Sequence, residues 1–352
     1  MCDNFRPIFE LSRGKTIESI HFGAIAVVDS SGRLLARLGN PQLVTFLRSS
    51  SKPLQVLPFI EQGGDQAYHL TSKEIAVLCA SHSGTDEHVA VIRAIQAKVD
   101  VQESDLLCGV HPPYDLPTAE AMKARGELPT SNRHNCSGKH TGMLAFARMR
   151  SLPINDYVNN GHPVQQMILT TMAEMCRMPV SHVELGMDGC SAPNFAMPLY
   201  NAARGFASLC DPRGLSIERA AACKRVTNSM VAYPGMVGGP GRFDTCLMEA
   251  CGGRILAKGG AEGYVAMGVM PGALGAESPG IGIVLKVSDG DLNGRVRPAV
   301  SLEILRQLDF ISPKELKTLE EFGPSRPVYN WRKLQVGESH PSFELEKADT
   351  QA

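Results

Sequence analysis

Ser49 and Lys52 are the first side chains whose types and spacing could carry out a reaction. They lie in the segment Arg48-Ser-Ser-Ser-Lys52 at the expected start of a helix, where residues three apart share a face. Lysine can take the proton of a serine hydroxyl if its pKa falls from about 10.4 toward about 7, which needs burial or a second nearby ammonium group. The spacing alone is weak evidence, because Ser12 and Lys15 share it and have no assigned role.

Two further segments could bring an alcohol and a second lysine to this pair. Residues 79–84 form a small, hydroxyl-rich turn after an apolar helix, where Ser81 could be exposed beside backbone donors. Residues 256–263 place Lys258 at the end of a predicted strand and Glu262 four residues later, among glycines that permit close approach. The alternatives are an ordinary helix end with a glycine cap and a glycine-rich hairpin.

A thiol, an amine and an imidazole lie close together in the segment 135–142, as Cys136, Lys139 and His140. A thiolate and a neutral amine can both bind zinc, and a distant thiol such as Cys190 could complete the site. Lysine is a rare zinc ligand, so these residues alone leave open whether the segment binds metal or only begins a helix.

Taken together and in order, these motifs resemble the L-asparaginase II family of the Rhizobium etli type. The motifs are Arg48-Ser-Ser-Ser-Lys52-Pro, Ser81-His-Ser-Gly, Asn135-Cys-Ser-Gly-Lys-His, Met187-Asp-Gly-Cys190 and Lys258-Gly-Gly-Ala-Glu-Gly. The resemblance also includes Gly238-Gly-Pro-Gly-Arg-Phe-Asp-Thr245 and Asn330-Trp-Arg332, so it covers nearly the whole chain except its ends. Ser50 and Ser51 depart from it, because family members often carry small apolar residues there.

The resemblance implies a fold similar to serine β-lactamases and serine-dependent glutaminases, and a homodimer. It also implies two catalytic pairs in one pocket, Ser49 with Lys52 and Ser81 with Lys258. Which serine forms the covalent intermediate stays open, because each has a lysine. We expect backbone amides around Ser81 to hold the oxyanion.

The family further implies a zinc ion bound by Cys136, Lys139 and Cys190, with Asp188 holding a metal-bound water. Zinc in this position is expected to support substrate binding rather than to generate the nucleophile, because the serine-lysine pairs already supply an attacking group.

The expected reaction is hydrolysis of the side-chain amide of L-asparagine to L-aspartate and ammonia through a serine acyl-enzyme. Arg48 is expected to bind the α-carboxylate and Asp188 the α-amino group. His140 is assigned to the substrate site, and Glu262 is expected there too, as the residue that orients Lys258.

Three alternatives remain open. A serine-dependent glutaminase would use the same amide chemistry, and one methylene changes binding by only about 1–3 kcal/mol. A β-lactamase-like acyl hydrolase shares the Ser-x-x-Lys spacing, but the chain lacks Ser-Asp-Asn and Lys-Thr-Gly. A non-catalytic, zinc-organised binding protein would use the thiols for stability only.

The elements expected to position these residues are strands at both ends of the chain and helices between them. Strands are predicted at 20–28 and 33–38, joined as a hairpin, and at 254–257, 264–270 and 280–287. Helices are predicted at 52–61, 72–80, 87–98, 138–150, 163–177, 196–208 and 297–308. This order predicts an α+β fold with a mainly antiparallel sheet flanked by helices. We expect one compact domain over 1–338 and a polar, mobile tail over 339–352.

Composition excludes several classes of partner. The formal net charge is −1, with acidic and basic residues mixed along the chain, so nucleic acid and anionic membranes are poor candidates. No apolar run approaches the roughly 18 residues of a spanning helix, and the first ten residues are too polar for a signal peptide. The ten scattered cysteines form no Cys-x-x-Cys pair and are expected to be reduced, so we expect a cytoplasmic protein.

Overall fold

The main feature of the fold is a nine-stranded sheet built from both ends of the chain. The computed structural model describes residues 4–348. Within them the strand order is β10-β11-β1-β2-β9-β8-β7, with β3 paired to β2 and β12 to β3, and every pair is antiparallel. The strands are β1 (Arg6–Arg13), β2 (Thr16–Asp29), β3 (Leu34–Leu38), β7 (Ile255–Gly259), β8 (Tyr264–Val269), β9 (Ile281–Val287), β10 (Arg326–Tyr329), β11 (Gln335–Pro341) and β12 (Glu346–Lys347).

A second, three-stranded sheet and the helices complete the molecule. The small sheet has the order β4-β6-β5, formed by β4 (Val44–Phe46), β5 (Glu184–Met187) and β6 (Pro193–Pro198). The helices are α1 (Lys52–Gln55), α2 (Leu57–Glu61), α3 (Gly64–Ala67), α4 (Ser72–Leu78), α5 (Asp86–Val99), α6 (Leu116–Ala124), α7 (Ser137–Met149), α8 (Pro163–Met175), α9 (Leu199–Cys210), α10 (Ile217–Ala232), α11 (Pro234–Val237), α12 (Phe243–Ala250), α13 (Val296–Gln307) and α14 (Pro313–Thr318). The predicted α+β fold is therefore confirmed.

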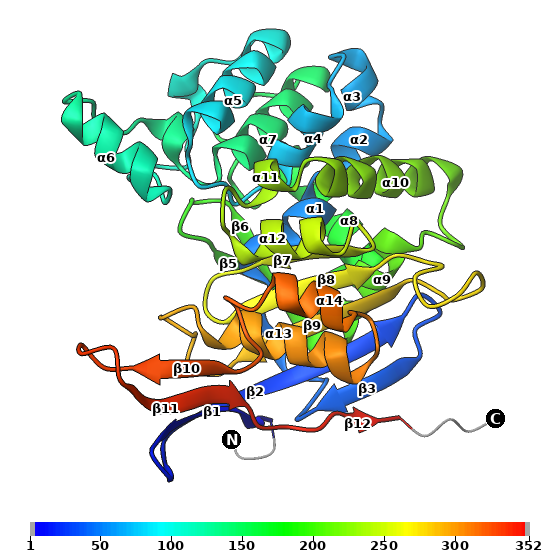
Figure 1. Cartoon of the computed structure of the whole chain (residues 1–352). Helices are drawn as coiled ribbons and strands as arrows, with labels where there is room; N and C mark the ends of the chain where they lie inside the picture. The colour runs from blue at the N-terminus through cyan, green and yellow to red at the C-terminus, as the bar shows by residue number, and fades with distance from the viewer. Residues whose placement is uncertain (1–3, 349–352) are drawn as a thin grey trace.

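Helices cover both faces of the central strands. α9 packs on β2, β8 and β9, while α13 packs on β9, β8 and β1. Successive residues of a strand point to opposite faces, and residues 281–285 of β9 are all buried, so both of its faces are covered. Most of the remaining helices, including α2 to α7, form a block at the top of Figure 1, away from β1, β10 and β11 at the bottom.

Several predicted boundaries need correction. The helix predicted over 52–61 is broken at Val56 into α1 and α2, each beginning with a proline in its first turn. Residues 196–198, predicted to be helical, pair with β4 and β5 as the end of β6, and α9 begins only after them. The long helix α10 was not predicted from the sequence, because its mixed polar and alanine-rich composition gives a weak helical pattern.

The polar segment after residue 338 is not a mobile tail where the structure describes it. Ser339–Pro341 belong to β11 and pair with β1, and β12 pairs with β3. Backbone pairing orders this segment although its side chains are polar, which is why composition misled the prediction. The last part of the predicted tail, residues 349–352, lies outside the described residues.

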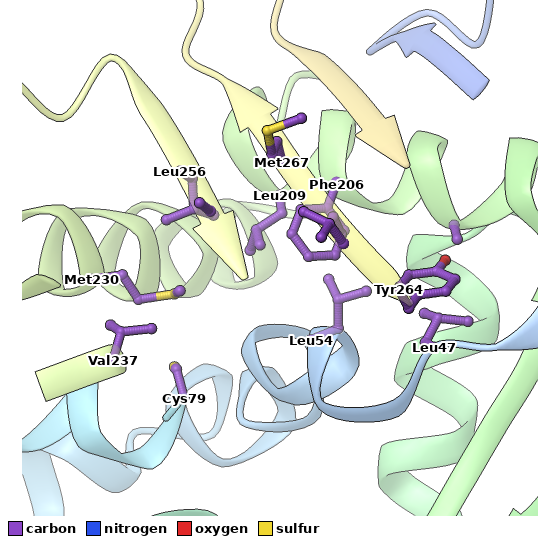
Figure 2. Close-up of a cluster of buried hydrophobic side chains, with 14 of the residues drawn as sticks. Leu47, Leu54, Cys79, Phe206, Leu209, Met230, Val237, Leu256, Tyr264 and Met267 are labelled. Carbon is purple, nitrogen blue, oxygen red and sulfur yellow. The ribbon is translucent and has the colours of Figure 1, made fainter. Parts of the chain in front are cut away.

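A buried apolar cluster joins the helical block to the sheet. Figure 2 shows its members projecting from α1, α9, α10, α11, β7, β8 and nearby turns. Leu47, Cys79 and Leu256 belong to it and are fully buried, and each lies two residues before a predicted catalytic residue. The core therefore fixes the backbone immediately before Ser49, Ser81 and Lys258. Within residues 4–348, no helix combines the length and apolar character needed to cross a bilayer.

The contact between β9 and α9 predicts a severe effect of Gly282→Ala. An added Cβ would lie 1.8 Å from the carbonyl oxygen of Ala203 in α9, so helix and strand would have to separate. We expect the free energy of unfolding to fall by about 1–3 kcal/mol in urea denaturation. The control is Gly235→Ala, where a Cβ has open space, and an equal loss in both variants would contradict the proposed close packing.

Candidate active site

Ser49 lies directly after a residue with an unusual backbone conformation. Arg48 has φ of 52°, in the left-handed region that side chains other than glycine rarely adopt. Its N–H donates to Asn194 Oδ1 at 3.1 Å, and its carbonyl accepts from Ser51 Oγ at 2.8 Å. Such strain costs on the order of 1–3 kcal/mol and persists only where surrounding bonds hold it. The turn presents Ser49 at the surface of a cleft while Ser50 and Ser51 are buried.

Lys52 is buried and bonded to the Ser81 turn. Its Nζ donates to Ala80 O at 2.6 Å, Ser81 Oγ at 2.8 Å and Asn135 O at 3.4 Å. These three acceptors match the three protons of an ammonium group. Within residues 4–348 no hydrogen bond joins Lys52 to Ser49, so the structure brings Lys52 to the second predicted serine. The three-residue spacing places Lys52 on the same face as Ser49, but the direction of its long side chain is decided by the oxygen atoms that surround its amine.

Backbone and histidine contacts hold Ser81 in its turn. The N–H of Ser81 donates to Val237 O at 3.0 Å, and that of Gly84 donates to His82 Nδ1 at 3.1 Å. His82 is buried, stacks on His88 with ring centroids 4.9 Å apart, and lies 2.9 Å from Ser137 Oγ. Because Ser81 and Gly84 already use their N–H groups, the prediction that amides around Ser81 hold an oxyanion is wrong for these two donors.

Lys258 is the second buried lysine and lies at the end of β7. Its side chain is fully buried, and Nζ donates to Gly259 O at 2.8 Å. Burial lowers the pKa of Lys258 to about 7 even though the nearby Asp244 carboxylate opposes this, and the charges of Lys52 and Arg242 lower it further. This value is the one that a lysine base needs near neutral pH.

Asp244, rather than Glu262, is the carboxylate beside Lys258. Asp244 Oδ2 lies 4.0 Å from Lys258 Nζ and accepts a hydrogen bond from Gly259 N–H at 2.7 Å. Glu262 instead lies 3.7 Å from Arg48 Nη1, so its predicted role toward Lys258 is wrong. Asp244 was not assigned from the sequence, although it belongs to the motif at residues 238–245 that carries part of the family resemblance.

Arg48 and Asp188 form an ion pair with each other. Asp188 Oδ1 lies 3.1 Å from Arg48 Nε and 2.9 Å from Arg48 Nη2, and it also accepts from Gly189 N–H at 2.8 Å. The two residues predicted to bind opposite ends of the substrate therefore bind one another, and Glu262 adds a second carboxylate near the same guanidinium.

The predicted zinc ligands meet in one buried cluster. Lys139 Nζ donates to Cys190 Sγ at 3.0 Å. A hydrogen bond with Cys190, together with burial, raises the pKa of Cys136, and the same bond lowers the pKa of Cys190. Burial acts to lower the pKa of Lys139, but the charges of Cys190 and Cys136 raise it overall.

His140 lies beside this cluster, and burial lowers its pKa to about 4. Its Nδ1 lies 2.7 Å from Tyr157 Oη, and an interaction with Cys190 acts against the effect of burial on its pKa. Over residues 4–348, no three side chains drawn from His, Cys, Asp and Glu are arranged to hold a metal ion. A site here therefore depends on lysine as a ligand.

Ser49 and Ser81 line the same cleft, which has a volume of about 470 Å³. Both buried lysines lie behind its lining. The backbone N–H groups of Ser49 and Ala261, which also line it, have no acceptor among the described residues. The other lining residues that concern the chemistry are Tyr114, Asn135, Arg242, Asp244 and Arg297.

Alcohols and buried amines gathered in one cleft are typical of hydrolases that act through a covalent intermediate. A family model described as L-asparaginase II matches residues 9–341, so this chain belongs to the L-asparaginase II family. The predicted family is confirmed, and membership identifies the protein as an amidohydrolase.

Solved structures similar to this chain include a covalent complex of Bacillus subtilis glutaminase YbgJ, with 10% identity and a TM-score of 0.39 over 82% of this chain and 88% of that one. Mglu in its native form has 12% identity and a TM-score of 0.44 over 84% of this chain and 67% of that one. At these TM-scores the likeness says nothing about substrate or mechanism. A comparison with curated proteins gave no match.

The lowered pKa of Lys258 predicts a pH-dependent cost to stability. Between pH 10 and 7 the unfolded chain takes up a proton on this lysine that the folded chain does not, so folding weakens by about 1.4 kcal/mol per pH unit. Lys258→Met removes this cost. Urea denaturation measures the free energy of unfolding of both proteins. The value for Lys258→Met minus the value for the wild type should therefore increase as the pH is lowered from 10 to 7, and it should stay constant below pH 7.

The control is Lys15→Met, at an exposed turn, which should leave the pH dependence of the wild type in place. If the difference between Lys258→Met and the wild type is the same at pH 7 and pH 10, Lys258 does not have a lowered pKa.

Proposed function

We propose that this protein hydrolyses the side-chain amide of L-asparagine to L-aspartate and ammonia through a serine ester. One observation carries the proposal: two buried lysines lie behind two serines of one cleft, and one lysine has a pKa of about 7. Family membership supports the choice of an amide substrate. A non-catalytic binding protein would have no need of a neutral amine that is costly to bury.

Ser49 is the proposed nucleophile, and Lys258 is the proposed base. Ser49 is the more exposed of the two serines and begins a helical turn, where its own N–H is free. Lys258 can be neutral near pH 7, whereas Lys52 Nζ already donates to three oxygen acceptors. Ser49 would attack the amide carbonyl while its proton passes to Lys258.

The free N–H groups of Ser49 and Ala261 are the proposed donors to the oxyanion. Ser81, bonded to the Lys52 ammonium, would then give its proton to the leaving nitrogen and regain one from Lys52. Ammonia leaves and a β-aspartyl ester of Ser49 remains. Water would attack that ester, with its proton passing to the amines, and L-aspartate would be released.

Ser49→Ala should lower kcat by at least about 10³-fold, because it removes the attacking oxygen. The measurement is ammonia release from L-asparagine, with L-glutamine as a second substrate to resolve the choice between asparaginase and glutaminase. Mass spectrometry of peptides from rapidly quenched protein should place an aspartyl group on Ser49. An aspartyl group on Ser81 would reverse the roles of the two serines. Full activity of Ser49→Ala would exclude Ser49 as the nucleophile, and no ammonia release by the wild type from either amide would favour the non-catalytic alternative.

Because Lys258 must be neutral to accept the proton, kcat/KM should rise with pH through about 7 and then level off. A stopped assay over pH 5.5 to 9 measures this profile. Asp244→Asn should move it to lower pH, because the Asp244 carboxylate raises the pKa of Lys258 and its removal lowers that pKa. If kcat/KM falls as pH rises from 6 to 8, the base is not Lys258.

Zinc bound by Cys136, Lys139 and Cys190 is part of the same proposal. Two sulfurs and one nitrogen converge at a buried point, and the His140 imidazole lies beside Cys190, so the donors suit a soft divalent ion. When bound, zinc would fix the thiolates and order the wall next to Asp188.

The family resemblance also supports a homodimer, which sedimentation of the purified protein would test.

Cys190→Ser should reduce bound zinc, measured by elemental mass spectrometry, and raise KM more than it lowers kcat. Zinc here would order the substrate site rather than supply the attacking group, so activity should weaken and persist. Cys246→Ser, at a half-buried thiol in α12 outside the cluster, is the control. Equal zinc content in the wild type and both variants would contradict the assigned ligands.

A further inference from the structure

Two oppositely charged side chains at the start of α12 line the cleft beside the serines. Arg242 is exposed, and its guanidinium makes no hydrogen bond or ion pair within residues 4–348. Asp244 is almost buried, with 11% of its side chain exposed, and among the described residues only its Oδ2 accepts a hydrogen bond. A carboxylate can accept up to about four hydrogen bonds, so Asp244 Oδ1 is available to a ligand. The cleft thus offers one free positive group and one free carboxylate oxygen.

Both groups lie next to the reacting centre. Asp244 Oδ2 is 4.0 Å from Lys258 Nζ, and the charge of Arg242 also acts on that amine. α12 packs against β7, the strand that carries Lys258, and the two elements lie together in Figure 1. A small substrate whose amide carbon is at Ser49 would therefore extend toward Arg242 and Asp244.

The other arginine near Ser49 is a weaker candidate for binding an anion. Arg48 already bonds Asp188 through two nitrogens and has Glu262 3.7 Å away. One positive and two negative charges give this group a net charge of −1, which disfavours a further carboxylate. Arg297, also at the cleft, is bonded to Asp291 and to Gly260 O.

We infer that Arg242 binds the α-carboxylate of the substrate and Asp244 its α-ammonium group, so the cleft selects amides that carry both groups of a free α-amino acid. This inference rests on the proposed amidase function and names the substrate class of that same site. It replaces Arg48 and Asp188 as the direct contacts of the α-groups. Arg48 then acts as a positioning residue, which holds the strained turn before Ser49 through its ion pair.

Two analogues of L-asparagine, each lacking one of the two charged α-groups, test the two contacts separately. Succinamic acid keeps the carboxylate and lacks the amino group, whereas 3-aminopropanamide keeps the amino group and lacks the carboxylate. Arg242→Gln should raise KM by about 10- to 100-fold for L-asparagine and succinamic acid and leave 3-aminopropanamide unchanged. Asp244→Asn should raise KM for L-asparagine and 3-aminopropanamide and leave succinamic acid unchanged.

The analogues also separate binding from a role of Asp244 in tuning Lys258. Tuning alone would change kcat and its pH profile equally for all three substrates, whereas binding changes KM for selected ones. Arg213→Gln, at a solvent-exposed arginine in a separate depression, is the matched control and should behave as the wild type. Equal effects of Arg242→Gln on all three substrates would overturn the inference, as would a carboxylate-selective effect of Arg48→Gln in its place.

A direct binding measurement distinguishes failure of this inference from failure of the proposed function. Calorimetry with L-aspartate, the proposed product, should show binding to the wild type and to Ser49→Ala, and at least about 10-fold weaker binding to Arg242→Gln. If that pattern holds while no amide is hydrolysed, the α-amino-acid site stands and the reaction is wrong. If L-aspartate binds wild type and Arg242→Gln equally, the site is wrong whatever the reaction.

Discussion

The burial of two lysine amines behind one cleft is the constraint on which the rest of the site depends. An ammonium group away from water loses much of its hydration, and two of them side by side also repel. The structure resolves this by giving the two lysines unequal surroundings. Lys52 has three oxygen acceptors, whereas Lys258 has one carbonyl and a carboxylate 4.0 Å away. Burial therefore lowers the pKa of Lys258 to about 7, so this lysine can be a neutral amine near neutral pH.

This arrangement requires rigid backbone on both sides of each reacting group. The apolar cluster of Figure 2 includes residues that lie just before Ser49, Ser81 and Lys258, so packing fixes the points where the three segments leave the core. Hydrogen bonds then fix the turns themselves, through Asn194 at Arg48 and Val237 at Ser81. A closely packed interior resists displacement, so the amines and alcohols keep their relative positions without a bound substrate.

The sequence predicted the class of fold and most of the residues at the site, but not how they pair. Apolar runs bounded by turn residues located β2, β3, β8 and α7, and much of β2, β8 and α7 is buried on all sides, as at every position of β8 and over residues 137–147 of α7. The two serines and two lysines were identified by their motifs, and the structure places Ser49 and Ser81 in the lining of one cleft, with Lys52 bonded to Ser81. Lys52 nevertheless bonds Ser81 rather than its sequence neighbour, because acceptors from a distant turn surround the end of its side chain. Spacing along a chain carries no information on contacts of that kind.

The positions of the carboxylates Glu262 and Asp244 also could not be predicted from spacing along the chain. Glu262 was assigned to Lys258 because it follows four residues later, but φ of 56° at Glu262 redirects the turn and its side chain reaches Arg48. Asp244 comes from α12 and takes the place beside Lys258, where its charge limits the fall in the pKa of that lysine. A carboxylate in this position has two effects that favour catalysis together. It keeps the amine basic enough to accept a proton, and its free oxygen offers a counter-charge to a substrate ammonium group beside the reacting bond.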